Sequence, residues 1–118
     1  MNDWERLENQ YHQLVLQHTF MQMECLTRES NDSLMNLCTT MLNFIRRFEG
    51  QAQAVTKADE LNIMKKNVYL FRGQAKKYLR DDGYVVDFQF VLIFDPNNAE
   101  AQAEVINFGQ PRSCCMIG

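Results

Sequence analysis

Residues 4–25 read WERLENQYHQLVLQHTFMQMEC, and this stretch decides the fold of the N-terminal part of the chain. Apolar or ring-bearing side chains recur through it at alternating spacings of three and four residues: Trp4, Leu7, Tyr11, Leu14, His18, Met21 and Cys25. Such spacing places one stripe on one side of an α-helix and favours packing against a second helix. We call this stripe a seam, and it predicts a helix that runs from about residue 3, where Asn2 or Asp3 can cap it, to residue 28.

Two later stretches repeat the pattern and predict two more long helices, over residues 32–48 and from within 51–56 to about residue 80. The second seam consists of Leu34, Leu37, Met41, Phe44 and Phe48. The third consists of Leu61, Met64, Val68, Phe71, Ala75 and Tyr78. We therefore expect a mainly α-helical fold built as a small bundle of three long, heptad-patterned helices. The seams could meet within one chain or across a homodimer.

Residues 84–94 read YVVDFQFVLIF, and their structure stays open between two alternatives. Val86, Phe88, Phe90, Leu92 and Phe94 would share one face of a β-strand. A run this apolar also fits a short helix that is buried on most sides, because periodicity does not separate the two. A lone strand would need a partner, most simply in a second chain. Residues 99–108 then predict a short helix capped by Asn98, so that the chain ends in a C-terminal hairpin and a short helix.

The composition indicates one helical domain over residues 1–109 and a flexible tail over residues 110–118. The chain has 118 residues, of which 46% are hydrophobic, and its five Gly and two Pro are few for a sheet-and-turn architecture. No apolar run approaches the roughly 18 residues that a bilayer requires. The N-terminus lacks the basic start and apolar centre of a signal peptide. We therefore expect a cytoplasmic protein that does not span a membrane.

Motifs that carry chemistry are missing from the sequence. The four cysteines form no CxxC pair and no zinc-ligand spacing, and the two histidines are six residues apart, which does not place them together on one helix face. No glycine-rich phosphate-binding motif is present, and no nucleophile is followed by a recognisable base. We therefore expect no catalytic residue, no cofactor and no metal, and we interpret the chain as not being an enzyme.

Charge is distributed unevenly, and the helix expected near residues 57–80 is basic. This segment holds seven basic and two acidic residues, a balance of +5, whereas the whole chain has a net charge of −3. The basic residues could pair with acidic segments of the same chain, or they could meet an acidic protein partner or a phosphate backbone. The overall negative charge disfavours nucleic acid. The candidate partner-binding residues are Lys65, Lys66, Arg72, Lys76, Lys77, Phe88, Phe90 and Phe94.

Residues 70–104 resemble one helical hairpin of a tetratricopeptide repeat. The matching residues are Arg72-Gly73-Gln74-Ala75, Tyr84, Asp87-Phe88-Gln89, Val91-Leu92 and the closing turn Asp95-Pro96-Asn97-Asn98-Ala99-Glu100-Ala101. The resemblance covers less than a third of the chain. It implies a helical scaffold that binds peptide segments of other proteins and has no catalysis of its own.

These patterns together predict a non-enzymatic protein–protein interaction module, an adaptor, scaffold or assembly subunit that acts through its seams and its basic helix face. The expected partners are proteins, including a second copy in a homodimer. The alternative is a nucleic-acid-binding regulator that uses the basic helix over residues 57–80. The C-terminal Cys115-Met-Ile-Gly118 has the form of a prenylation box, although Gly is not a typical final residue, so Cys115 is a weak candidate for lipidation.

Overall fold

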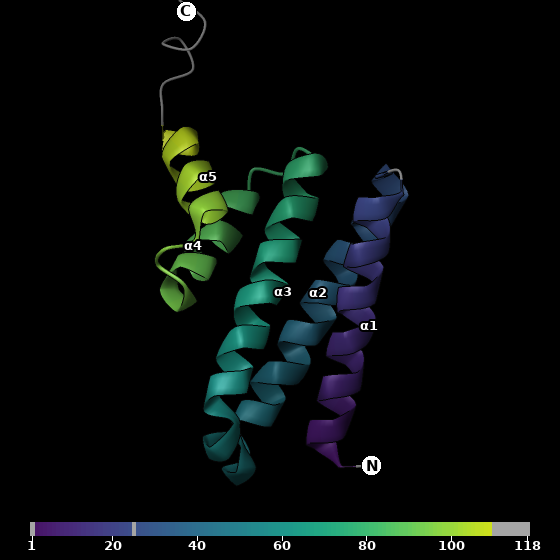
Figure 1. Cartoon of the computed structure of the whole chain (residues 1–118), viewed down its shortest axis with the longest axis vertical. Helices are drawn as coiled ribbons and strands as arrows, with labels where there is room; N and C mark the ends of the chain where they lie inside the picture. Colours follow the sequence, from purple (N-terminus) through teal and green to yellow (C-terminus); the bar gives the residue numbers. More distant parts are fainter. Residues whose placement is uncertain (1, 25, 110–118) are drawn as a thin grey trace, which may run out of the picture.

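The computed structural model describes residues 2–24 and 26–109, and within this part of the chain it is mainly helical and has no β-strand (Figure 1). The elements are α1 (Asp3–Met23), α2 (Arg28–Glu49), the 3₁₀-helix η1 (Ala52–Lys57), α3 (Ala58–Tyr78), α4 (Tyr84–Phe94) and α5 (Ala99–Gly109). The predicted helical fold class is therefore confirmed. The expected tail and the candidate lipidation site Cys115 lie outside the described residues, as do Cys25 and Cys114. No described helix is both long enough and apolar enough to cross a bilayer.

Side-chain caps fix where the first two helices begin. Asn2 accepts a hydrogen bond from the backbone nitrogen of Glu5 at 2.8 Å, as predicted for a capping residue at the start of α1. The start of the second helix differs from the prediction, because α2 begins at Arg28 rather than near residue 32. Thr27 and Ser30 form a reciprocal capping box, each side chain bonded to the other's backbone nitrogen at 3.0 Å. This box starts α2 four residues earlier than predicted.

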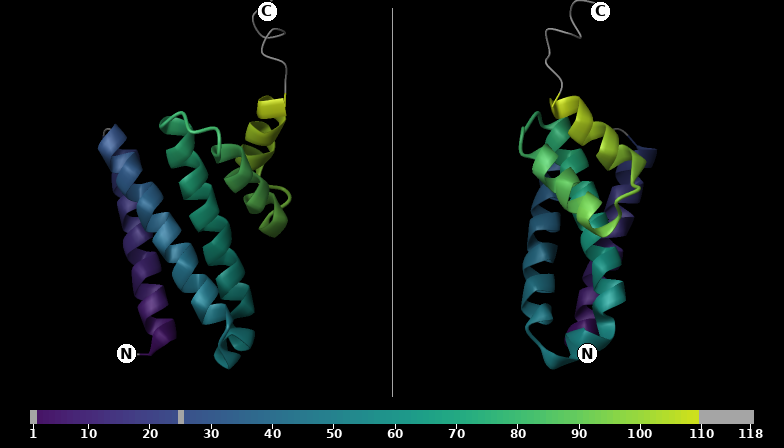
Figure 2. Two further views of the ribbon diagram at one scale, coloured as in Figure 1. Left: turned by 180° about the vertical axis from the view of Figure 1, so that it is seen from behind. Right: turned by 90° about the vertical axis from the view of Figure 1, so that its left-hand side faces the viewer.

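The three long helices α1, α2 and α3 run alongside one another (Figure 2), and they share one core in which most seam residues are buried. At one end the rings of Trp4 and Phe48 join α1 to α2 at a centroid distance of 5.5 Å. Further along, His18 of α1 stacks on Phe71 of α3 at 3.8 Å. Most of each seam is therefore buried within a single chain, and the buried side chains supply most of the stabilisation through apolar burial.

Residues 84–94 form the helix α4 rather than a strand. Helix α4 packs on α3, and α5 packs on α4, on the side of α3 away from α1 (Figures 1 and 2). A second, smaller core joins them through Phe88 and Val91 of α4 and Ala101 of α5. Asn98 caps α5 as predicted, because its side chain accepts from the backbone nitrogen of Ala101 at 2.9 Å. A short strand in this position would have left its backbone groups unpaired, since no other strand is present in the described residues.

Gly73 permits the close approach of α4 to α3. A Cβ atom at this position would lie 3.2 to 3.3 Å from three carbons of the Phe88 ring. Phe88 is fully buried, so its ring would have to shift to admit that atom. The absence of a side chain at Gly73 therefore sets the distance between the two helices.

Candidate interaction surfaces

The predicted basic face of α3 is largely paired with acidic residues of the same chain. Lys65 lies 2.5 Å from a carboxylate oxygen of Glu49 in α2, and Lys77 forms an ion pair with Glu104 in α5. Arg72 and Lys76 both contact Asp87 in α4, at 2.8 Å and 3.2 Å. Among the five predicted basic contacts, only Lys66 has no ion pair within the described residues. Four of the five charges therefore hold α3 to its neighbours.

The strongest of these contacts is a two-pronged clamp between Arg72 and Asp87. The Nε and Nη2 atoms of Arg72 donate to the two carboxylate oxygens at 3.0 Å and 2.8 Å, and Nη1 donates to Thr39 of α2 at 3.2 Å. Burial alone would lower the pKa of Arg72. The hydrogen bond and the charge of Asp87 raise the pKa by more than burial lowers it, so the net shift is upward. This clamp ties α2, α3 and α4 together, so Arg72 is engaged within the chain.

The three predicted aromatic contacts have different environments. Phe88 is fully buried beneath α3 and has no surface to offer a partner. Phe94 is half-buried, with the Nζ atom of Lys65 5.1 Å from its ring centroid. Phe90 stacks on Tyr69 at 4.6 Å and still exposes 37% of its surface. Of these three rings, Phe90 is therefore the one with substantial access to solvent.

An apolar stripe runs along the outer face of α4, and two of its three members were not predicted. Val86, Phe90 and Ile93 follow one another at spacings of four and three residues, with exposed fractions of 48%, 37% and 67%. We call these three residues the α4 stripe. Helices that are apolar on every face are normally buried on every face. The all-round apolar sequence of residues 84–94 was the signal that could have found this stripe.

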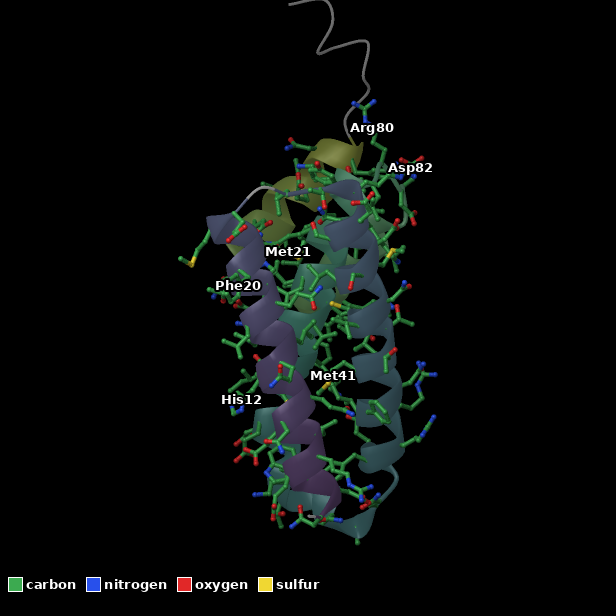
Figure 3. The ribbon with its side chains drawn as sticks, turned by 90° about the vertical axis from the view of Figure 1, so that its right-hand side faces the viewer. His12, Phe20, Met21, Met41, Arg80 and Asp82 are labelled. Atoms are coloured by element: carbon green, nitrogen blue, oxygen red, sulfur yellow. The ribbon has the colours of Figure 1, made fainter. Side chains whose placement is uncertain are left out.

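A second apolar surface is a groove between α1 and α2, with a volume of about 520 Å³. Its apolar lining consists of Leu14, Leu16, Phe20, Leu37, Met41 and Phe44. The remaining lining residues, Gln10, Gln13, Gln17 and Thr40, are polar without charge. Figure 3 looks onto α1 and labels Met41 between the two ribbons. We call this feature the α1–α2 groove.

The groove arises because the apolar face of α2 is wider than α1 can cover. Leu37 and Phe44 belong to the predicted second seam, yet Leu37 is 40% exposed and Phe44 only half-buried. On α1, Leu16 and Phe20 lie outside the predicted seam and expose 55% and 64% of their surfaces. Sequence reasoning missed them because they are off the three-and-four repeat.

One end of the groove is basic. A smaller hollow of about 270 Å³, which shares Gln10 and Phe44 with the groove, is lined also by Arg6, Arg47 and Asp3. The guanidinium of Arg47 lies 5.5 Å from the ring centroid of Phe44. Asp3 accepts a hydrogen bond from Gln51 at 2.9 Å, whereas Arg6 forms no ion pair within the described residues. This end of the groove therefore favours an acidic group.

Polar side chains also meet near the junction of α1, α3 and α5. Nε2 of His18 lies 2.8 Å from the amide oxygen of Gln74, whose nitrogen donates to both carboxylate oxygens of Glu100 at 3.0 and 3.1 Å. These groups satisfy one another, which is typical of a structural network. No cluster of three or more metal-ligating side chains occurs in residues 2–24 and 26–109.

The comparisons with known proteins gave no match to any family model, curated protein or solved structure. Residues 70–104 do form two helices and the start of a third, but the resemblance to a tetratricopeptide repeat stays a prediction.

Proposed function

We propose that this chain is a non-enzymatic protein–protein interaction module, built as a three-helix bundle of α1–α3 that carries the helices α4 and α5 on one flank. The observation that supports the proposal is the α4 stripe. Helix α4 already buries Phe88 and Val91 against its neighbours, yet it presents Val86, Phe90 and Ile93 to solvent. Contiguous exposed apolar residues on a helix that is otherwise part of a core are typical of an interface.

The spacing of the stripe suits recognition of another protein. Side chains at positions i, i+4 and i+7 of a helix are the usual anchors when a helix docks on a groove or on another helix. Full burial of a Val, Phe or Ile side chain contributes about 1.5–3 kcal/mol. Three partly buried side chains would therefore contribute several kcal/mol, enough to matter for a reversible complex.

The alternative, binding of nucleic acid through α3, has less support from the contacts. It needs Lys65, Arg72 and Lys76 to reach phosphates, and these residues are paired with Glu49 or Asp87. Breaking these pairs would expose acidic groups that repel phosphate. Such binding would fall steeply as salt concentration rises, whereas association through apolar side chains would persist.

The test is light scattering behind a sizing column, at low and high salt, as protein concentration rises. We expect masses above the 13.9 kDa of one chain, retained at high salt. Ile93→Glu should return the protein to a monomer, because it places a charge within the stripe. Asn107→Glu is the matched control, since Asn107 is exposed on α5, lies outside the stripe and is polar already. Equal behaviour of the two variants would contradict the proposal.

A further inference from the structure

We propose that the α1–α2 groove binds the α4 stripe of a second copy of this chain, so that copies join head to tail. This inference rests on the proposed function and adds the identity of the surface that receives the stripe.

Shape distinguishes the two apolar surfaces. The stripe is the outward face of a single helix and is convex, whereas the groove is a hollow of about 520 Å³ between two helices. Two grooves placed face to face would leave much of both hollows unfilled, and two stripes would leave both grooves exposed. A stripe set into a groove buries both surfaces at once, which is how one helix packs on a pair of helices.

Length also agrees. The stripe extends from Val86 to Ile93, about 10 Å along a helix axis, and α4 as a whole is about 16 Å long. The groove extends along α1 from Gln10 to Phe20, which corresponds to about 15 Å at the same rise per residue. A helix of the length of α4 therefore matches the length of the groove.

The charges at the ends favour one direction of docking. The groove has no charged lining residue along its length, and it opens at one end beside Arg6 and Arg47. Helix α4 is preceded by two exposed acidic residues, Asp81 and Asp82. With the start of α4 at the arginine end, these carboxylates lie near the guanidinium groups and the three apolar anchors lie over the uncharged part of the groove.

The geometry has a consequence for assembly. Because the donor and acceptor surfaces differ, each copy can offer its stripe to one neighbour and its groove to another. Wild-type protein should therefore grow beyond a dimer as its concentration rises. A symmetric dimer, by contrast, would stop at two copies.

A complementation experiment tests the proposal directly. The stripe variant carries Val86→Glu and Ile93→Glu, and the groove variant carries Leu16→Glu and Phe20→Glu. Each variant alone should be a monomer of 13.9 kDa, because each lacks one of the two surfaces. An equimolar mixture should form a dimer of twice that mass and nothing larger, since only one intact stripe meets one intact groove.

Matched controls separate these effects from loss of folding. Thr19→Glu adds a charge to the exposed surface of α1 beside Phe20 without lining the groove, and Asn107→Glu adds one to the exposed surface of α5, away from the stripe. Both controls should assemble like wild type, and circular dichroism should show helical content unchanged in all variants. If the groove variant fails to fold, Gln13→Glu replaces it, because it adds a charge to the groove wall and removes no apolar contact.

The remaining outcomes overturn the inference in distinguishable ways. If the groove variant assembles like wild type while the stripe variant is a monomer, the stripe binds elsewhere and only the proposed function stands. If both variants are monomers and their mixture stays monomeric, the interface is symmetric and the head-to-tail arrangement is wrong. If wild type is a monomer throughout, or the stripe variant assembles unchanged, the inference fails together with the role proposed for the stripe.

Discussion

Arg72 of α3 holds both carboxylate oxygens of Asp87 in α4, at 3.0 Å and 2.8 Å, and the Asp87 side chain is almost completely buried. Lys76 approaches the same carboxylate at 3.2 Å. Two cations therefore compensate one buried anion at the junction between the long helices and the C-terminal pair. The arrangement fixes where α4 docks, because a displaced Asp87 would lose both partners in a site with little access to water.

Asp87→Asn should lower the free energy of unfolding by about 3–5 kcal/mol, the usual cost of breaking a buried ion pair from one side. The amide cannot accept two charge-assisted hydrogen bonds, and the positive charges of Arg72 and Lys76 would lose their counter-ion. Urea unfolding followed by circular dichroism measures the change. Asp82→Asn is the control, because Asp82 is exposed and should alter stability by less than about 0.5 kcal/mol. Equal stabilities for the two variants would show that the clamp is not structural.

Gly73→Ala should destabilise the protein by about 1 kcal/mol, although alanine is the better helix former by a similar amount. The added Cβ would come within 3.2 to 3.3 Å of the buried Phe88 ring, and such overpacking costs about 1–3 kcal/mol. Phe88→Leu removes part of the ring and should make the same change at Gly73 neutral or stabilising. A double-mutant cycle measured by thermal unfolding tests this coupling. Strict additivity of the two changes would contradict it.

The sequence was sufficient for the parts of the fold that depend on local pattern. The three-and-four spacing located the buried faces of α1 and α3, and the capping chemistry of Asn2 and Asn98 located two helix starts. Residues 84–94 could not be assigned in this way, because their burial pattern depends on contacts that are distant in sequence. Phe88 meets Gly73, and Asp87 meets Arg72, both 15 residues earlier in the chain.

The candidate surfaces were less predictable for a similar reason. A count of charges showed that α3 is basic, but pairing of Lys65 with Glu49 or of Lys77 with Glu104 depends on how the helices cross. The groove exists because the apolar face of α2 is slightly wider than the surface that α1 covers. Leu16 and Phe20 lie outside the seam that the spacing predicts, so the sequence did not single them out.

Stability should decrease at alkaline pH because of Cys38. Burial raises the pKa of the Cys38 thiol to about 12, with a smaller opposing effect of Arg72 and a smaller supporting effect of Asp87. The unfolded thiol titrates near 8.5, so above that pH the folded state binds more protons than the unfolded state and stability falls as pH rises towards 12. The slope contributed by this one group approaches about 1.4 kcal/mol per pH unit.

Cys38→Ala should remove that contribution, so its unfolding free energy should fall less steeply than that of wild type between about pH 9 and pH 11. The slopes are compared rather than the absolute stabilities, because the alanine variant also loses packing. The same burial should protect Cys38 from thiol reagents in folded protein at neutral pH, as measured by peptide mapping after labelling. Rapid labelling without unfolding, or parallel pH slopes, would exclude this account of Cys38.

Reversing the charge of Asp82, just before α4, tests whether the start of α4 docks at the basic end of the groove. Asp82→Arg should weaken assembly by about three- to fivefold at low salt, because exposed charge pairs contribute about 0.2–1 kcal/mol and the reversal also introduces repulsion from Arg6 and Arg47. Adding Arg6→Glu to the same chain should restore most of the lost affinity, and high salt should abolish both effects. Asp32→Arg, a reversal at an exposed position that lines neither the groove nor its basic end, should leave affinity unchanged. If Arg6→Glu fails to rescue Asp82→Arg, then the start of α4 does not lie at the arginine end, and docking in the opposite direction would be required.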